Sequence, residues 1–121
     1  MRILLDTNFI IDVVRFKIDL DSIVDLVGGS ELATLSSVER ELIKISERTS
    51  KAGMYAKSAL TLIKERSIKI IKSEGRPDNA MLKLADDKTI IATNDTELRK
   101  RLKVLGGKTI YLKSKKHLAI G

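Results

Sequence analysis

Short apolar runs alternate with longer segments of mixed polarity along the chain, and this pattern predicts its secondary structure. Five runs rich in Ile, Leu and Thr are typical of buried parallel strands, in which polar and apolar positions need not alternate. The predicted strands are residues 3–5, 32–35, 68–71, 89–93 and 109–112. The segments between them carry apolar residues at helical spacing behind capping or first-turn residues. The predicted helices are residues 9–14, 21–27, 36–45, 54–64, 77–84 and 94–105.

Two of these helices have predicted caps. Ser36 or Ser37 is the expected cap of the third helix, and Asn94 with Glu97 forms a capping box at the start of the sixth. Regular alternation of strands and helices predicts an α/β fold, with a central parallel sheet of about five strands and helices on both faces. The 121 residues contain no internal repeat and no linker rich in Pro and Gly. We therefore expect a single domain over residues 1–121.

Acidic residues follow the carboxyl ends of the predicted strands, at or near the starts of the helices that come next. Asp6 follows the first strand, Asp95 follows the fourth, and Asp78 opens the helix between the third and fourth. Glu39 and Glu41 lie in the first turns of the helix after the second strand. Each acid alone is also an ordinary capping or first-turn residue, which the helix dipole favours by ~0.3–1 kcal/mol. Because ligands of an open α/β sheet bind at the carboxyl ends of its strands, we expect these acids to converge.

Carboxylates that lie close together repel one another and raise one another's pKa, unless a cation binds between them. The chain has no Cys and a single His, which excludes a thiolate zinc site, a cysteine nucleophile and a multi-histidine metal site. Oxygen ligands alone suit Mg²⁺ or Mn²⁺. Asp86 and Asp87 precede a strand, so we expect them in a solvated turn at the opposite end of the sheet.

The charge of the chain is strongly uneven. The formal net charge is +7, yet residues 1–60 carry a net charge of −1 and residues 61–121 one of +8. No acidic residue follows Glu97, whereas the basic C-terminal segment from about residue 99 holds eight Lys and Arg residues. Such a segment is either a solvated surface or a binding face for a polyanion, and its one-sidedness favours a nucleic acid.

No segment of the sequence predicts contact with a membrane. The first apolar run meets an acid at Asp6, so the N-terminus lacks the apolar region of a signal peptide. No apolar run approaches the ~20 residues that span a bilayer. We therefore expect a cytoplasmic protein without a membrane partner.

Four motifs in order along the chain resemble the acidic motifs of PIN domains. The first is Leu-Asp-Thr-Asn-Phe-Ile at residues 5–10, and the second is Ser-Ser-Val-Glu-Arg-Glu-Leu at residues 36–42. The third is Asp78 with the helix that follows it, and the fourth is Ile-Ala-Thr-Asn-Asp-Thr-Glu-Leu at residues 91–98. The resemblance spans about residues 3–114 and is closest to the archaeal and eukaryotic ribosome-biogenesis type of the small-subunit processome. It implies a PIN-like (Rossmann-like) three-layer α/β/α sandwich.

The resemblance to PIN domains also implies a metal-dependent endoribonuclease in which acidic residues hold Mg²⁺ or Mn²⁺. Carried over by position, the catalytic and metal-binding acids are Asp6, Glu41, Asp78 and Asp95. Helical position does not distinguish Glu39 from Glu41, because both flank the apolar stripe at similar angles, but the Glu-Leu step of the family motif favours Glu41. One departure is Asn79, where this group often has a second Asp. The Asn79 side chain still offers a carbonyl oxygen as a metal ligand, but it lacks the negative charge of Asp.

The reaction implied by the resemblance is hydrolysis of an RNA phosphodiester by in-line attack of water, with one metal ion or two about 4 Å apart. The expected auxiliary residues, which hold substrate phosphate or orient the carboxylates, are Thr7, Asn8, Asn79, Thr93, Asn94 and Glu97. The expected contacts to the RNA backbone are Arg99, Lys100, Arg101, Lys103, Lys113, Lys115 and Lys116. Precursor rRNA is the expected substrate. The expected protein partners are ribosome-assembly proteins or a second copy of the chain in a homodimer.

Two other functions fit the same residues. Toxin-type PIN ribonucleases of toxin–antitoxin pairs share the acidic set but usually lack such a basic end. A non-catalytic RNA-binding assembly factor would keep the fold and the basic face while the acids serve as helix caps, and Asn79 mildly favours this function. A small antitoxin gene immediately upstream would indicate the toxin, and RNA cleavage that does not depend on Asp6 or Asp95 would argue against a nuclease.

Overall fold

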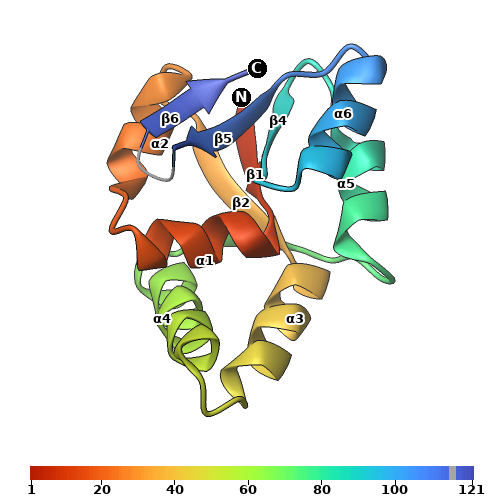
Figure 1. Cartoon of the computed structure of the whole chain (residues 1–121). Helices are drawn as coiled ribbons and strands as arrows, with labels where there is room; N and C mark the ends of the chain where they lie inside the picture. The colour runs from red at the N-terminus through yellow and green to blue at the C-terminus, as the bar shows by residue number, and fades with distance from the viewer. Residues whose placement is uncertain (115–116) are drawn as a thin grey trace.

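The computed structural model describes residues 1–114 and 117–121, and Figure 1 traces the elements in order. The strands are β1 (Arg2–Leu5), β2 (Glu31–Leu35), β3 (Lys69–Ile71), β4 (Thr89–Ala92), β5 (Thr109–Lys113) and β6 (His117–Ile120). The helices are α1 (Thr7–Arg15), α2 (Leu20–Leu26), α3 (Ser36–Ser46), α4 (Lys51–Glu65), α5 (Pro77–Leu84) and α6 (Thr96–Val104). Every predicted helix and strand is present, with ends that differ by a few residues.

The strands form one sheet in the order β3-β2-β1-β4-β5-β6. β1 pairs in parallel with both β2 and β4, so Leu4 lies opposite Ala33 on one side and Ile91 on the other. β3 and β5 continue the parallel pairing outward. This order is that of doubly wound α/β sheets, and it reverses between β1 and β4. The predicted α/β fold is confirmed, and the position where such sheets bind ligands is the carboxyl end of β1 and β4.

The sheet contains one strand that the sequence did not predict. β6 runs antiparallel to β5, from Ile110 opposite Ile120 to Lys113 opposite His117. One of the expected RNA contacts, Lys113, is the last residue of β5. The expected RNA contacts Lys115 and Lys116 lie outside the described residues. The four residues of β6 form a weak strand signal by themselves, since strand propensity depends on the neighbour that a strand packs against.

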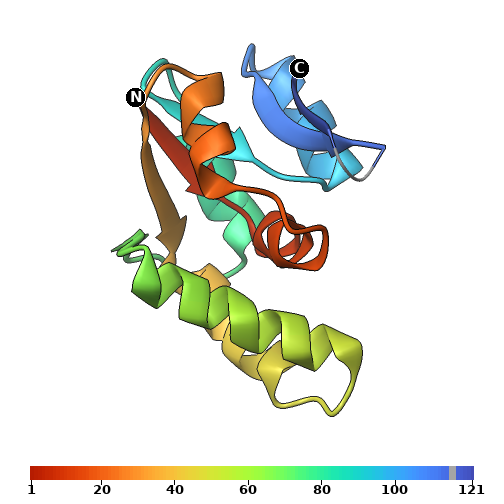
Figure 2. The same cartoon turned by 90° about the vertical axis from the view of Figure 1, so that its left-hand side faces the viewer.

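Two groups of helices lie on opposite sides of the sheet (Figures 1 and 2). α1 contacts α3 and α4, and α5 contacts α6. The core between these layers contains Leu4 of β1, Phe9 of α1 and Leu42 of α3, all fully buried, together with Leu102 of α6, which is 1% exposed. Complete burial of a side chain of this kind contributes about 1.5–3 kcal/mol.

The start of α3 differs from the prediction. Leu35 occupies the N-cap position, and no side chain caps the helix there. Ser36 and Ser37 instead bond to Ser73 in the loop after β3: the Ser36 hydroxyl donates to the Ser73 carbonyl at 3.0 Å, and the Ser37 and Ser73 hydroxyls are 2.7 Å apart. These bonds hold the beginning of α3 against the loop that leads into α5.

α3 and α4 form a helical hairpin that extends beyond the sheet (Figure 2). The turn that joins them packs tightly against Gly53 of α4, where a Cβ atom would collide with the backbone carbonyl of Arg48. Because α1 contacts both helices of the hairpin, the hairpin is fixed to the element that begins at the end of β1.

Candidate active site

Asp6 lies directly after β1 and is 7% exposed. It is the N-cap of α1, and its Oδ1 accepts a hydrogen bond from the backbone N–H of Thr7 at 2.8 Å. Its Oδ2 accepts one from the hydroxyl of Thr93, which follows β4, at 2.7 Å. One carboxylate thus bonds to the ends of two neighbouring strands, and both of its oxygens are fixed in orientation.

Glu41 joins this group through Thr7. The Thr7 hydroxyl donates to Glu41 Oε2 at 2.7 Å, which brings the second turn of α3 to the beginning of α1. Glu39 lies elsewhere, because it lines a surface groove together with Ile63 of α4 and Ile68 before β3. The helical pattern left the two glutamates equivalent, whereas the fold places Glu41 beside the residue that follows Asp6.

Asp95 lies after β4 and is the N-cap of α6. Its Oδ1 accepts from the backbone N–H groups of Glu97 and Leu98 at 2.9 and 3.3 Å. Its own backbone N–H donates to the Thr93 hydroxyl at 3.1 Å, so Thr93 contacts both Asp6 and Asp95. The predicted capping box of Asn94 and Glu97 is therefore wrong, because Asp95 rather than Asn94 caps the helix.

The pKa of Asp6 is raised above its ordinary value. Burial is the largest cause, and the hydrogen bonds from Thr93 and Thr7 oppose it by favouring the ionised form. The negative charges of Glu41 and Asp95 raise the pKa further. Asp6, Glu41 and Asp95 therefore form one electrostatically coupled group at the carboxyl edge of the sheet.

Asp78 has different contacts from those of this group. Its Oδ1 is 3.6 Å from Arg76 Nε, and its Oδ2 is 3.9 Å from Arg101 Nη1 of α6. It is not among the charges that act on the pKa of Asp6. The backbone N–H of Asn79 donates to Asp78 Oδ1, and the Asn79 residue itself is exposed.

The remaining auxiliary residues have different surroundings. Asn8 and Glu97 are exposed at the starts of α1 and α6. Asn94 is bonded on both sides: its Nδ2 donates to Asp12 Oδ2 at 2.8 Å, and its Oδ1 accepts from the backbone N–H of Leu112 at 2.8 Å. Sequence reasoning missed Asp12. The signal that could have identified it is a lone acid inside an otherwise apolar segment. A carboxylate that is half-buried in such a segment needs a polar partner.

The basic residues of α6 divide into two kinds. The Arg99 guanidinium lies 3.4 Å from the centroid of the Tyr111 ring, and its Nε donates to the Thr109 hydroxyl at 3.3 Å. Lys100 and Lys103 are exposed and line a shallow groove beside the C-terminal residue. Two of the predicted RNA contacts, Arg99 and Arg101, thus have partners within the fold, and the exposed lysines lie beside them.

The donor set of the site suits a hard divalent cation. It consists of carboxylate oxygens whose mutual repulsion a cation would relieve. Within residues 1–114 and 117–121, no three acidic or histidine side chains surround one point closely enough to form a complete ligand cage. Mg²⁺ does not require one, because it commonly binds through one or two carboxylates and completes its shell with water and substrate phosphate.

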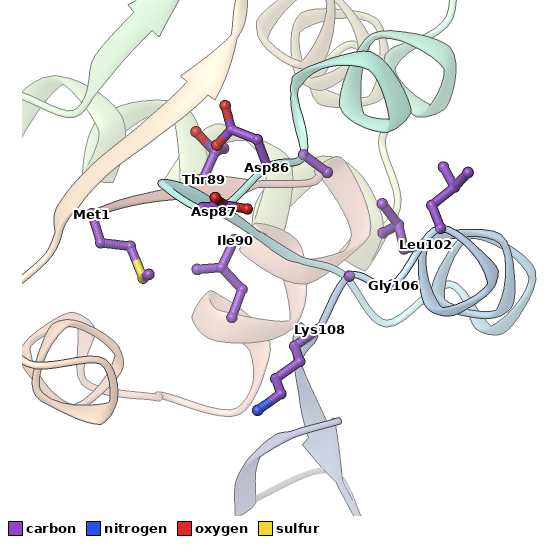
Figure 3. A pocket seen from close by; sticks show the side chains of 11 residues that line it. Met1, Asp86, Asp87, Thr89, Ile90, Leu102, Gly106 and Lys108 are labelled. Atoms are coloured by element: carbon purple, nitrogen blue, oxygen red, sulfur yellow. The ribbon is translucent and has the colours of Figure 1, made fainter.

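A pocket lies at the amino end of the strands, away from the candidate site (Figure 3). Its volume is about 300 Å³, and Met1, Asp86, Asp87 and Lys108 are among its lining residues. Asp86 and Asp87 form the expected turn before β4, because Asp86 makes an isolated bridge to Thr89. These two acids therefore lie at the end of the sheet that the coupled carboxylates do not occupy.

The fold and the ordered acidic residues at its carboxyl edge define a PIN-type domain. The family model described as a PIN-like domain matches residues 3–115, and the chain belongs to this family. The resemblance carried by the four motifs is confirmed at the level of the family.

Two relatives in sequence are named as ribonucleases. Ribonuclease VapC4 of Methanocaldococcus jannaschii is 28% identical over 125 residues, which cover 98% of this chain and 95% of that protein. Ribonuclease VapC9 of Archaeoglobus fulgidus is 29% identical over 117 residues, which cover 95% of this chain and 85% of that protein.

Similar structures include the PIN domain endonuclease Utp24, with a TM-score of 0.80 at 21% identity over 98% of this chain and 90% of that one. VapBC-1 from nontypeable Haemophilus influenzae has a TM-score of 0.53 at 15% identity, over 93% of this chain and 98% of that one. At these identities the similarity shows a shared fold alone.

In the described part of the chain, no helix is long and apolar enough to cross a bilayer.

Proposed function

We propose that the chain is a metal-dependent ribonuclease that hydrolyses RNA phosphodiester bonds at the carboxyl edge of β1 and β4. One observation carries the proposal: the buried carboxyl of Asp6 is linked to Glu41 through Thr7 and to Asp95 through Thr93, at the position where doubly wound sheets bind ligands. A site that concentrates negative charge in this way suits Mg²⁺ or Mn²⁺. The two relatives named as ribonucleases support RNA as the substrate.

Asp6 and Asp95 are the first-rank metal ligands in this proposal, and Glu41 completes the set. When bound, Mg²⁺ or Mn²⁺ lowers the pKa of the attacking water and offsets charge on the phosphate. Thr93 and Thr7 hold the carboxylates of Asp6 and Glu41 through hydroxyl bonds of 2.7 Å each. Such supporting bonds fix the direction of the oxygens that face the metal.

Asp78 has a lower rank in this proposal because of its arginine contacts. At 3.6 and 3.9 Å, its pairs with Arg76 and Arg101 are loose and solvent-exposed, and pairs of this kind contribute little stability. An RNA phosphate that binds Arg101 would compete with Asp78 for the guanidinium. The exposed Lys100 and Lys103 lie on another face of α6, beside Arg99, where they would bind the RNA backbone.

The toxin type is the biological role that the relatives favour. Both ribonucleases matched in sequence are VapC proteins, the toxin class, and each aligns over nearly the whole chain. The expected role in rRNA processing rests on motif resemblance and on the likeness to Utp24, which at 21% identity concerns the fold. We therefore place the toxin-type ribonuclease first and rRNA processing second.

The activity is tested by incubating purified protein with single-stranded RNA and Mn²⁺. Wild type is expected to cleave, and EDTA is expected to stop the reaction. Asp95→Asn keeps an oxygen that can cap α6 but loses the charge, so we expect a fall of about 100-fold or more in rate. Equal cleavage by wild type and Asp95→Asn would mean that the activity belongs to a contaminant.

The biological role has a separate test. We expect expression of the wild-type chain to arrest growth, and co-expression of a small gene encoded immediately upstream to relieve the arrest. Asp95→Asn is the matched control, since it should not arrest growth. Normal growth with wild type, together with accumulation of shortened precursor rRNA, would favour rRNA processing instead.

A further inference from the structure

Asn94 is the middle residue of the Thr93–Asp95 segment that carries part of the proposed site. The segment lies between β4 and α6. Its backbone is held at both ends, since the Thr93 N–H donates to the Ile110 carbonyl at 2.9 Å and the Asp95 carbonyl accepts from the Arg99 N–H at 3.0 Å. The two residues beside Asn94 are both joined to the site: the Thr93 hydroxyl donates to Asp6 Oδ2 and accepts from the backbone N–H of Asp95. The side chain of Asn94 makes its contacts elsewhere.

The amide of Asn94 bridges two elements that flank the segment. Its Nδ2 donates to Asp12 of α1 at 2.8 Å, and its Oδ1 accepts from the backbone N–H of Leu112 in β5 at 2.8 Å. These partners determine the amide orientation, since a carboxylate only accepts and a backbone N–H only donates. Both bonds are partly buried, which makes an unpaired group costly.

The geometry points to Asp12 and Asn94 as a positioning pair that fixes the distance between Asp6 and Asp95, an inference that rests on the proposed nuclease site. α1 begins at Asp6 and carries Asp12 less than two turns later, while Asp95 directly follows Asn94. The Asp12–Asn94 bond therefore links the helix that starts at one proposed ligand to the residue beside the other. Neither Asp12 nor Asn94 contacts the metal in this account.

Exchanging the two side chains tests the pair. Asn94→Asp places a carboxylate against Asp12 at the position of the 2.8 Å bond, and the two like charges repel. Asp12→Asn alone preserves the bond, because the oxygen of the new amide still accepts from Asn94. In the double variant, position 12 donates to position 94, which still accepts from Leu112, and the net charge equals that of wild type.

Mn²⁺ binding measured by isothermal titration calorimetry is the first readout. We expect Asn94→Asp to bind Mn²⁺ about 10-fold more weakly or worse, Asp12→Asn to bind within about threefold of wild type, and the double variant to recover most of the loss. Asp12→Ala serves as a second variant in case Asn94→Asp fails to fold. Ala is compatible with the α1 helix but cannot accept the hydrogen bond from Asn94, so this variant should also weaken Mn²⁺ binding. Thermal unfolding of each metal-free variant reports whether it is folded.

RNA cleavage is the second readout. We expect Asn94→Asp to lower kcat at saturating RNA with little change in KM, because the pair acts on the metal ligands and not on the RNA contacts. Unchanged Mn²⁺ binding in Asn94→Asp and Asp12→Ala, or a double variant no better than Asn94→Asp, would overturn the inference. An Asp12→Asn variant as weak as Asn94→Asp would overturn it too, since Asp12 would then act through its charge as a ligand.

The two readouts separate this inference from the proposed function. If wild type binds Mn²⁺ with the expected variant pattern but leaves RNA intact, the nuclease proposal fails and the positioning pair stands. If wild type cleaves RNA and none of the variants changes Mn²⁺ affinity, the nuclease proposal stands and the positioning pair fails. A wild-type protein that does not bind Mn²⁺ contradicts both.

Discussion

Within the proposed site, Asp6 is the carboxyl whose ionised form is most disfavoured by its surroundings. It is 7% exposed, and burial together with the charges of Glu41 and Asp95 disfavours its ionised form. The hydrogen bonds from Thr7 and Thr93 reduce this effect without cancelling it, because the pKa remains raised. A divalent cation would remove the remainder by neutralising the coupled carboxylates.

The raised pKa of Asp6 predicts how the metal-free protein responds to pH. In the unfolded chain Asp6 ionises at its ordinary pKa, whereas in the fold it keeps its proton to a higher pH. The native state therefore binds more protons between these two values, and stability falls as the pH rises through that interval. Asp6→Asn removes this contribution.

Thermal unfolding in EDTA, between about pH 4 and pH 7, measures the difference. We expect wild type to lose more stability than Asp6→Asn over this range, and Mn²⁺ at pH 7 to stabilise wild type more than the variant. Parallel curves for the two proteins, with and without Mn²⁺, would show that Asp6 titrates normally.

The two glutamates of α3 provide a matched prediction. Glu41→Gln keeps an oxygen that accepts from Thr7 but removes the charge beside Asp6, so we expect kcat to fall by about 10-fold or more. Glu39→Gln alters the groove beside Ile63 and should leave kcat within about twofold of wild type. Single-turnover cleavage of the same RNA compares them, and a larger loss in Glu39→Gln would reverse the assignment.

Sequence reasoning identified the acids at this scale but not their environment. Asp6, Asp78 and Asp95 follow from strand ends and helix starts. The difference between Glu39 and Glu41 does not, because it depends on how α3 is rotated against α1. The pairing of Asp12 with Asn94 joins residues on separate elements, and nothing in the local pattern around either residue specifies it.

At the scale of elements, α6 contributes to both halves of the proposed function. Its N-cap is Asp95, and the exposed Lys100 and Lys103 lie further along the same helix. Arg99 has a different place, since its guanidinium stacks on Tyr111 and bonds to Thr109 in β5. Arg99 therefore anchors α6 to the sheet, and its replacement would disturb the fold as well as RNA binding.

The exposed lysines give the cleanest test of the RNA face. Replacing Lys100 and Lys103 with Gln should weaken binding of any single-stranded RNA and lower the salt dependence of log K by about 1.4, at about 0.7 per phosphate contact. Replacing the exposed Lys57 and Lys64 of α4 removes the same charge and serves as the control. Equal losses in both double variants, measured by fluorescence anisotropy over a salt series, would remove α6 from the binding face.

At the scale of the whole molecule, alternating strands and helices were enough to predict the doubly wound sheet. Each crossover leaves a strand end and a helix start at the same edge, so the order of acids in the sequence becomes a cluster in space. β6 escaped prediction because its four residues depend on pairing with β5. The strand order itself, with its reversal between β1 and β4, also required the structure.

The polarity of the sheet provides the most direct test of the account. Asp6 lies at the carboxyl edge, whereas the exposed Asp86 lies at the amino edge and lines the pocket there. Under single-turnover conditions with Mn²⁺ and single-stranded RNA, we expect Asp6→Asn to slow cleavage by about 100-fold or more and Asp86→Asn to remain within about twofold of wild type. Full activity in Asp6→Asn, or an equal loss in Asp86→Asn, would contradict a catalytic site at the carboxyl edge.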